Sequence, residues 1–239
     1  MPSDSPQIRP HVSQAFAREL EELRNGVLEM GGLVAQQLND AVTALASGDT
    51  EHASEIIQKD HLVNGMEVAL DERCTTILAT RQPAGGDLRF VLSVIKTITD
   101  VERIGDEAER VAKMAKFMAG DKLSPTVMNE IEHMGQLTYN MLNDALDAFA
   151  RTDVDAAVKT VAQDRKVDAK YESITRQMIT YMAGDPRSIS TALNVLWAAR
   201  AIERIGDRCR NLCEYIIYLV KGKDVRHTDM DQIFDEAGD

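Results

Sequence analysis

The chain of 239 residues repeats itself, and this duplication constrains its fold more than any other feature. The pentapeptide Glu-Arg-Ile-Gly-Asp stands at 102–106 and returns unchanged at 203–207, an offset of 101 residues. Upstream, further identities recur at an offset of 104, namely Met30-Gly31, Leu38–Ala41, Asp49, Asp60 and Val63 with Met134-Gly135, Leu142–Ala145, Asp153, Asp164 and Val167. Two constant offsets, separated by one change in loop length, indicate that the second half is a copy of the first.

The composition and the turn signals predict that both copies are helical. Only 14 Gly and 6 Pro interrupt the chain, and aromatic residues make up 5% of it. Ser124-Pro125 and Asp185-Pro186 each predict a helix N-cap followed by proline at the first helical position. The breaks delimit six helices at about 11–47, 50–81, 87–120, 125–151, 154–183 and 188–222.

Short loops between long helices require antiparallel neighbours. We therefore predict an all-α fold of two tandem three-helix bundles, related by a pseudo-twofold axis and packed on each other. The expected divisions are a disordered lead at 1–10, a first bundle at 11–121, a second bundle at 122–223 and an acidic tail at 224–239.

Charge and segment composition limit the classes of function. The net charge of −12 argues against a general nucleic-acid binder. No apolar run reaches membrane length, and the polar N-terminus is not typical of a signal peptide. The three cysteines, Cys74, Cys209 and Cys213, lack metal-type pairing and are expected to be buried and reduced, as in a cytoplasmic protein.

Carboxylates follow the apolar stripes of the third and sixth predicted helices. The inward stripe of 87–120 continues as Glu102 and Asp106, and that of 188–222 as Glu203, Asp207 and Asn211. The preceding helix of each copy carries its own polar stripe, with Asp60 and Asn64 in the first copy and Asp164 and Asp168 in the second. At about 1.5 Å rise per residue, the stripes of each hairpin are level to within about one turn, so they are expected to face each other.

Facing carboxylates predict a cation site in each copy. Each close pair costs roughly 1 kcal/mol even in a watery environment, and hard cations with oxygen ligands offset this repulsion. Mg²⁺, Mn²⁺, Ca²⁺ and iron remain open as the ion. The alternative is that Arg103, Arg110, Arg204 and Arg210 neutralise the acids in surface salt bridges. Gly105 and Gly206, mid-helix in both copies, indicate close approach by a neighbouring helix or by the site itself.

Other catalytic signals are weak. The chain has no nucleotide-binding glycine loop and no credible Ser-His-Asp or Cys-His arrangement. Glu130-x-x-His133 matches half of a carboxylate di-iron signature and is expected to be a polar face, while His61 lies near the first acidic stripe. Trp197 is expected in the core rather than in a stacking site.

The duplicated Glu-Arg-Ile-Gly-Asp helices, each with an Asp/Asn-bearing partner helix, resemble the PhoU family of phosphate-uptake regulators over residues 11 to 227. The segments Arg81-Gln82-Pro83, Asp87-Leu88-Arg89 and Ile202–Cys213 are also similar to that family. The resemblance implies a non-catalytic, cytoplasmic negative regulator of phosphate uptake and of the phosphate-starvation response. Such a protein would be a homodimer linking the phosphate ABC transporter ATPase to a sensor histidine kinase, and would meet the membrane only through these partners.

The resemblance also implies two metal sites. The first comprises Asp60, Asn64, Glu102 and Asp106, and the second Asp164, Asp168, Glu203, Asp207 and Asn211. Where the second copy has Asn211 and Glu214, the first has Arg110 and Lys113, so the first site is expected to bind metal more weakly. Two other functions stay open, a metal-dependent phosphohydrolase and a purely structural helical protein.

Overall fold

The computed structural model describes residues 14–120 and 124–225, and nearly all of them are helical. Its elements, in chain order, are α1 (Gln14–Ser47), α2 (Thr50–Arg81), α3 (Gly85–Phe117), α4 (Pro125–Arg151), α5 (Val154–Val161), α6 (Asp164–Gly184), the 3₁₀ turn η1 (Pro186–Ser188) and α7 (Ile189–Lys221). Within these described ranges there is no β-strand, which confirms the predicted all-α fold. The predicted lead at 1–10 and most of the tail at 224–239 lie outside the described residues.

Both predicted proline caps begin a helical element. The Ser124 hydroxyl accepts a hydrogen bond from the Thr126 amide at 3.3 Å, and α4 begins at Pro125. The Asp185 carboxylate accepts one from the Arg187 amide at 3.0 Å, but Pro186 begins the short turn η1 rather than α7 itself.

The helix predicted at 154–183 is interrupted at Ala162 and Gln163, which separate α5 from α6. Both residues keep helical dihedral angles, but the Gln163 and Lys166 amides bond to the carbonyl oxygens three residues earlier. Neither a proline nor a glycine occurs at this tightened turn to account for it. In the first copy α2 runs through the same stretch without a break.

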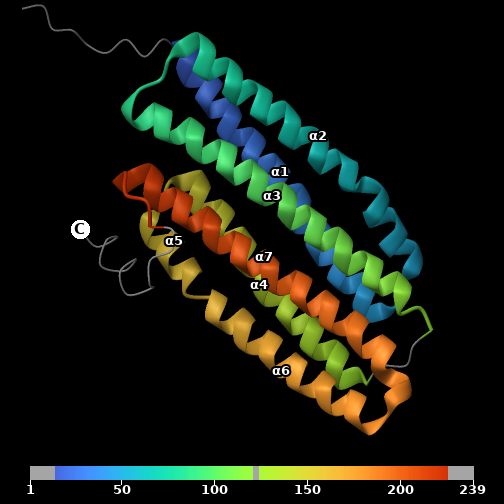
Figure 1. The fold of residues 1–239 in the computed structure, drawn as a ribbon. Helices are drawn as coiled ribbons and strands as arrows, with labels where there is room; N and C mark the ends of the chain where they lie inside the picture. The colour runs from blue at the N-terminus through green and yellow to red at the C-terminus, as the bar shows by residue number, and fades with distance from the viewer. Residues whose placement is uncertain (1–13, 121–123, 226–239) are drawn as a thin grey trace, which may run out of the picture.

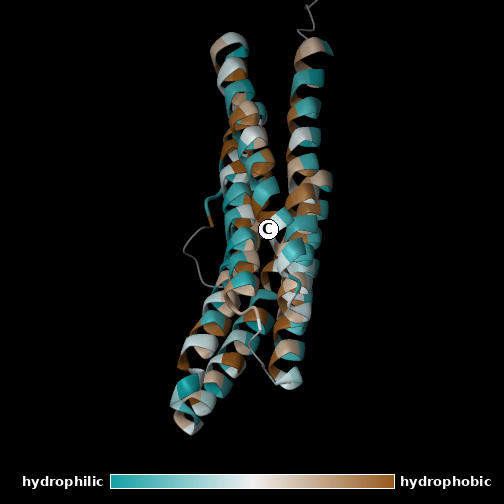
Figure 2. Ribbon diagram, turned by 90° about the vertical axis from the view of Figure 1, so that its right-hand side faces the viewer, coloured by the Kyte–Doolittle hydropathy of each residue, from teal (hydrophilic) through white to brown (hydrophobic). Residues whose placement is uncertain are grey.

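The helices lie lengthwise along one elongated molecule (Figure 1). Helices α3 and α7 are neighbours in the middle, with α2 along one outer edge and α6 along the other. The contact between α3 and α7 is the most extensive of any pair, and α1 also packs on α4. Brown apolar and teal polar residues alternate around each helix in Figure 2, as expected for amphipathic helices. The buried residues of both copies form one hydrophobic core.

Two glycines related by the duplication bring α1 and α4 close together. A Cβ atom on Gly31 would lie 2.4 Å from Leu146 Cδ2, and one on Gly135 would lie 2.7 Å from both methyl carbons of Val42. Since Gly31 repeats as Gly135 and Val42 as Leu146, the same contact occurs twice about the pseudo-twofold axis. Each glycine removes the side chain that would keep the two copies apart.

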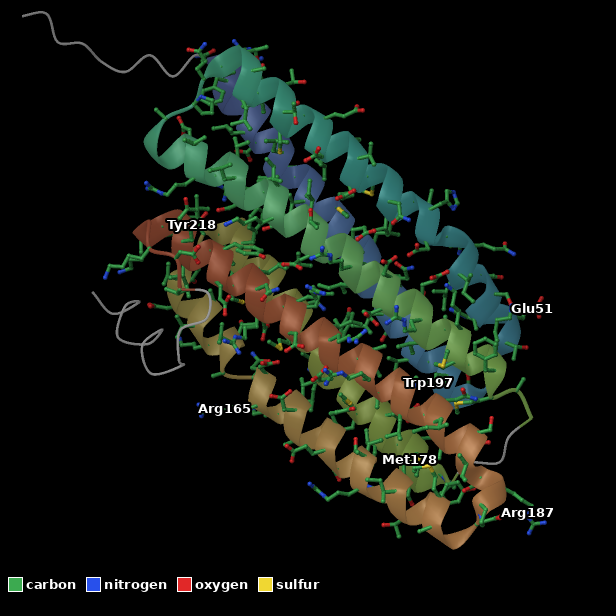
Figure 3. All side chains as sticks on the ribbon, viewed as in Figure 1. Glu51, Arg165, Met178, Arg187, Trp197 and Tyr218 are labelled. Atoms are coloured by element: carbon green, nitrogen blue, oxygen red, sulfur yellow. The ribbon has the colours of Figure 1, made fainter. Side chains whose placement is uncertain are left out.

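Several local predictions can now be compared with the structure. Cys74, Cys209 and Cys213 are free and buried, as expected. The expectation that Trp197 lies in the core is wrong, since its side chain is 54% exposed on α7 (Figure 3). Within the described residues, none of the helices combines the length and the hydropathy that a membrane span requires.

Candidate functional site

The acidic residues of the second copy meet between α6 and α7. Asp164 and Glu203 are 7% and 9% exposed, while Asp168 and Asp207 lie one turn further along their helices and face solvent. The order α6, η1, α7 reverses the chain, so the two pairs come from antiparallel neighbours. The predicted meeting of these four carboxylates therefore agrees with the structure, which leaves their role as metal ligands a prediction.

Two carboxylate oxygens in this cluster lack a hydrogen-bond partner. Asp164 Oδ1 and Glu203 Oε2 are buried and accept no hydrogen bond in the described structure. The other Glu203 oxygen, Oε1, accepts a hydrogen bond from Arg200 Nη1 at 2.6 Å. A Cβ atom on Gly206 would lie 3.2 Å from Asp164 Oδ1. Glycine therefore leaves room for a bare carboxylate oxygen beside the α7 backbone, an arrangement suited to an oxygen-ligated cation.

In the second cluster, burial and repulsion between neighbouring carboxylates raise the pKa values of two acids. Burial, followed by repulsion from Asp207, raises the pKa of Glu203 to about 7. Burial, followed by repulsion from Asp168 and Asp207, raises the pKa of Asp164 to about 6. A bound cation would favour the ionised forms that burial disfavours.

The first copy has the same arrangement of acids but a different environment. Burial raises the pKa of Glu102 and of Asp106, and Asp60 adds repulsion at both, so the three groups lie near one another. Asp60, however, is hydrogen-bonded. Its Oδ1 accepts from Gln37 Nε2 at 3.0 Å and its Oδ2 accepts from Asn64 Nδ2 at 3.4 Å.

The difference between the copies comes from α1 and α4. At the duplication offset of 104, Gln37 corresponds to Met141, which is fully buried and has no amide to donate. Asp60 Oδ1 therefore receives a hydrogen bond from a neighbouring helix, whereas its counterpart Asp164 keeps a bare oxygen. The sequence repeat shows that Gln37 and Met141 occupy equivalent positions. It does not show that the Gln37 side chain points toward Asp60.

The arginines do not neutralise the motif acids in the predicted way. Arg110 and Arg204 both bond to Glu107, and Arg103 lies 3.8 Å from Asp100. Arg210 bonds to Glu214 at 3.0 Å, so all four arginines pair with acids outside the two motifs. Among the described residues, Arg200, which was not one of the predicted four, bonds to the motif acid Glu203.

Asn211 is the one predicted ligand whose amide is engaged elsewhere. It donates to Asp100 Oδ2 of α3 at 3.2 Å, across the contact between the two copies. Asp100 is 2% exposed and was missed by sequence reasoning, because it belongs to no distinctive motif. His61, which lies near the first acidic stripe in the sequence, bonds within its own helix to the Gln58 carbonyl oxygen at 2.6 Å.

Within the part of the chain that the structure describes, no three His, Cys, Asp or Glu side chains converge as closely as ligands around one ion. The donor set nevertheless fits a hard cation, because it is made of carboxylate oxygens and two of them are buried without a partner. The bare oxygen of Asp164 and the space beside Gly206 make the second copy the better candidate.

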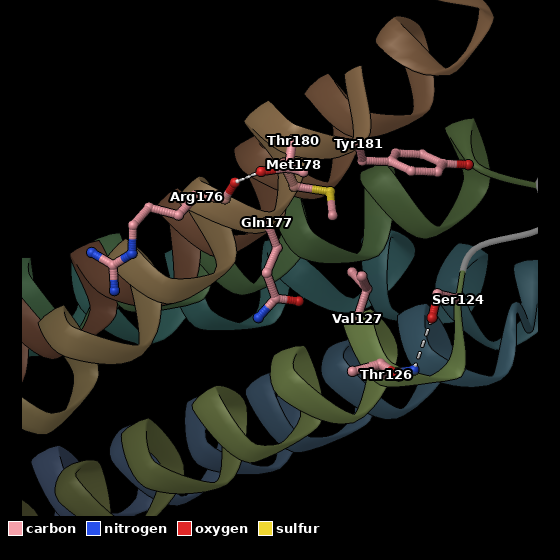
Figure 4. A pocket seen from close by; sticks show the side chains of 8 residues that line it. All are labelled: Ser124, Thr126, Val127, Arg176, Gln177, Met178, Thr180 and Tyr181. Atoms are coloured by element: carbon pink, nitrogen blue, oxygen red, sulfur yellow. Dashed lines mark hydrogen bonds between the residues drawn. The ribbon is translucent and has the colours of Figure 1, made fainter. Parts of the chain in front are cut away.

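One pocket lies away from both clusters, between the first turn of α4 and the last turns of α6 (Figure 4). Its volume is about 550 Å³, and it is lined by Ser124, Thr126, Val127, Arg176, Gln177, Met178, Thr180 and Tyr181. No acid, histidine or cysteine is among these lining residues. The pocket therefore offers no general acid–base pair for catalysis.

Comparison with known proteins identifies relatives of this architecture. A family model described as the PhoU domain matches twice, at residues 27–115 and 131–216. The phosphate-specific transport system accessory protein PhoU of Serratia marcescens is 48% identical over 226 residues, covering 95% of this chain and 93% of that protein. The protein of the same name from Escherichia coli K12 is 47% identical over 230 residues, covering 96% and 95%.

Solved structures agree with these sequence matches. The crystal structure of PhoU from Pseudomonas aeruginosa has a TM-score of 0.84 and 47% identity, covering 87% of this chain and all of that one. The phosphate transport system regulatory protein PhoU from Streptococcus pneumoniae has a TM-score of 0.83 at 33% identity, covering 88% and 99%. The similarity extends over nearly the full length of each protein.

Proposed function

Because this chain belongs to the PhoU family, we propose that it is a cytoplasmic accessory protein that restrains phosphate uptake and the phosphate-starvation response. In this proposal it is a non-catalytic homodimer that links the phosphate transporter ATPase to a sensor histidine kinase. The names of its relatives, accessory or regulatory proteins of phosphate transport, support the first part. The transporter and kinase contacts are the part that needs direct measurement.

We further propose that the protein binds metal, and that the second site is filled first. The observation that supports this is the pair of buried, partnerless oxygens, Asp164 Oδ1 and Glu203 Oε2. Leaving such oxygens bare in the folded state is costly unless a cation or a proton compensates. Asp168 and Asp207 would complete an oxygen-only ligand set, and the metal would supply the positive charge that holds α6 against α7.

A regulatory role suits the molecule better than hydrolysis. A metal-dependent phosphohydrolase needs a positioned base and a clamp for the substrate phosphate beside the metal. Among the described residues, Arg200 bonds to the motif acid Glu203, and the pocket between α4 and α6 lies elsewhere. Turnover of a phosphate ester with Mg²⁺ or Mn²⁺ that is lost in Asp207→Ala would overturn the adaptor proposal.

The deciding experiment is co-purification of the chain with the purified transporter ATPase and the cytoplasmic part of the sensor kinase. We expect complexes whose yield differs between high and low phosphate. Failure to retain either protein under both conditions would refute the adaptor proposal. Metal analysis of the same preparation, purified without chelator, tests the metal proposal separately: absence of bound or titratable metal would favour a purely structural role.

A further inference from the structure

Four arginines line the contact between α3 and α7. Two buried acids lie beneath them, and each acid is paired with one arginine of α3 and one arginine of α7. Glu107 accepts from Arg110 of its own helix at 3.0 and 3.1 Å and from Arg204 of α7 at 3.3 Å. Asp100 accepts from Arg208 of α7 at 3.1 Å and lies 3.8 Å from Arg103 of its own helix. We call these four residues, Arg103, Arg110, Arg204 and Arg208, the arginine seam.

The seam presents positive charge outward. Its acids are buried, whereas the side chains of Arg103, Arg110 and Arg204 are roughly half exposed. Arg110, Arg204 and Arg208 each bond to an acid through Nη1, Arg103 is only ion-paired, and a guanidinium carries five N–H donors. Donors therefore remain for an external carboxylate. The four arginines outnumber the two acids beneath them, on a chain with a net charge of −12.

Aromatic residues extend the seam at both ends. At one end the Lys96 ammonium lies 5.6 and 5.2 Å from the ring centres of Tyr215 and Tyr218. The cross-helix pairs define an antiparallel register in which 96 faces 215 and 107 faces 204. Continued along α3, this register brings Phe117 level with Asn194, three residues before Trp197.

Lys96, Phe117 and Trp197 share the outward face of the arginines, whereas Tyr215 is buried and its hydroxyl donates to Asp100 Oδ2 at 2.8 Å. On α3, Lys96, Arg103, Arg110 and Phe117 recur every seven residues, and on α7 Trp197 stands seven residues before Arg204, so each set lies along one side of its helix. Phe117 is 68% exposed. Among the described residues, no helix packs across this face.

Arginine, tryptophan and tyrosine are the residues that most often carry binding energy in protein interfaces. A third helix can pack along the outward sides of two antiparallel helices, and Lys96 to Phe117 spans about 32 Å at 1.5 Å per residue. The two arginine pairs lie seven residues apart on α3, about 10.5 Å. A complementary helix would carry carboxylates two turns apart, with apolar residues next to Trp197 and Phe117.

We propose that the arginine seam, with the aromatic residues at its ends, docks an acidic amphipathic helix of a partner protein. The inference rests on the proposed function, since it assigns the adaptor a binding surface and its partner a chemistry. Bidentate guanidinium–carboxylate bonds would give the complex its register, and burial of the exposed Trp197 and Phe117 would add affinity.

The test uses the full chain with the purified transporter ATPase and the purified cytoplasmic part of the sensor kinase. Trp197→Glu changes an exposed residue without breaking an ion pair of the seam, and Arg103→Glu reverses the charge of its most weakly paired arginine. We expect each variant to weaken binding of one of the two proteins at least about tenfold. Ile179→Glu, at an equally exposed apolar residue of α6, is the matched control and is expected to bind like the wild type. Circular dichroism confirms that each variant is folded.

The outcomes separate this inference from the proposed function. If the wild type binds neither protein, the adaptor proposal fails and this inference falls with it. If the wild type binds and both seam variants bind equally well, only the seam is refuted. The docking role of the seam is also refuted if the seam variants change dimerisation and leave partner binding unchanged. It is refuted likewise if the wild type binds RNA or anionic vesicles and the variants lose that binding. Weaker partner binding at high ionic strength supports the charge component.

Discussion

Equivalent residues of the two copies differ in what they contact. Asp60 and Asp164 stand at matched positions, yet only Asp60 receives an amide hydrogen bond from the neighbouring helix. Burial raises the pKa of Asp164 to about 6, and no side-chain amide donates to its buried Oδ1. The consequences are measurable by single substitutions.

Glu203→Gln should stabilise the metal-free protein at neutral and higher pH. Because the folded-state pKa of about 7 exceeds the unfolded value near 4.5, the native state holds more protons between these values. The free energy of unfolding of the wild type therefore falls as pH rises through that window. Glutamine removes the dependence, and we expect a gain of about 1–3 kcal/mol at pH 8 and little change at pH 4. Urea unfolding in the presence of a chelator measures the free energy of unfolding of both proteins at each pH. A wild-type value that rises between pH 5 and pH 7 relative to that of Glu203→Gln would contradict the raised pKa of Glu203.

Gln37→Met should make the first site resemble the second. Loss of the amide leaves Asp60 Oδ1 bare, so the metal-free protein should lose about 1–2 kcal/mol and the first site should gain several-fold in metal affinity. Met141→Gln is the reciprocal variant and should weaken the second site by supplying Asp164 with a donor. Calorimetric titration with Mn²⁺ measures both. Unchanged affinity in the two variants would show that the amide does not control the sites.

Among the elements, the contact between α1 and α4 depends on residues with no side chain. Val42 is branched at Cβ and cannot easily turn away from a methyl group placed 2.7 Å from its carbons. Gly32, one residue beyond Gly31 on α1, has nothing within 4 Å of its Cβ position. Substitution by alanine should therefore change the stability of the protein in opposite directions at these two kinds of glycine.

Gly135→Ala should destabilise the protein by about 1–3 kcal/mol through overpacking against Val42. Gly32→Ala is the control and should stabilise by about 0.5–1 kcal/mol, because alanine favours an exposed helix interior. Thermal unfolding measures both. Val42→Ala added to Gly135→Ala should recover part of the loss, and a double variant no more stable than Gly135→Ala would exclude this clash as the cause.

For the whole molecule, the extensive contact between α3 and α7 predicts that the two copies unfold as one cooperative unit. Either half produced alone, by a cut between Gly120 and Ser124, would expose the apolar side that it now buries against the other. We therefore expect each half to be aggregated or molten, and the two halves co-expressed to form a soluble complex. Size-exclusion chromatography and near-UV circular dichroism test this. A half that is monomeric with fixed tertiary structure would instead mark the predicted division near 121 as a boundary between independent domains.

The duplication, the all-α fold, most helix ends and the two acidic faces were predictable from the sequence. They depend on local conformational preferences and on hydrophobic periodicity, and both are set by residues that lie close together in the sequence. The break at Ala162–Gln163 was not, because no proline or glycine marks it.

Tertiary structure alone decided which acids are bare and which surfaces are free. Gln37 reaches Asp60 from a different helix, 23 residues away, and Arg204 reaches Glu107 across the two copies. The exposure of Trp197 likewise depends on which side of α7 is covered. A hydrogen-bond partner or a packing neighbour supplied by a distant segment leaves no local pattern, so the duplicated motif determined that there are two acidic clusters, and packing determined that they are unequal.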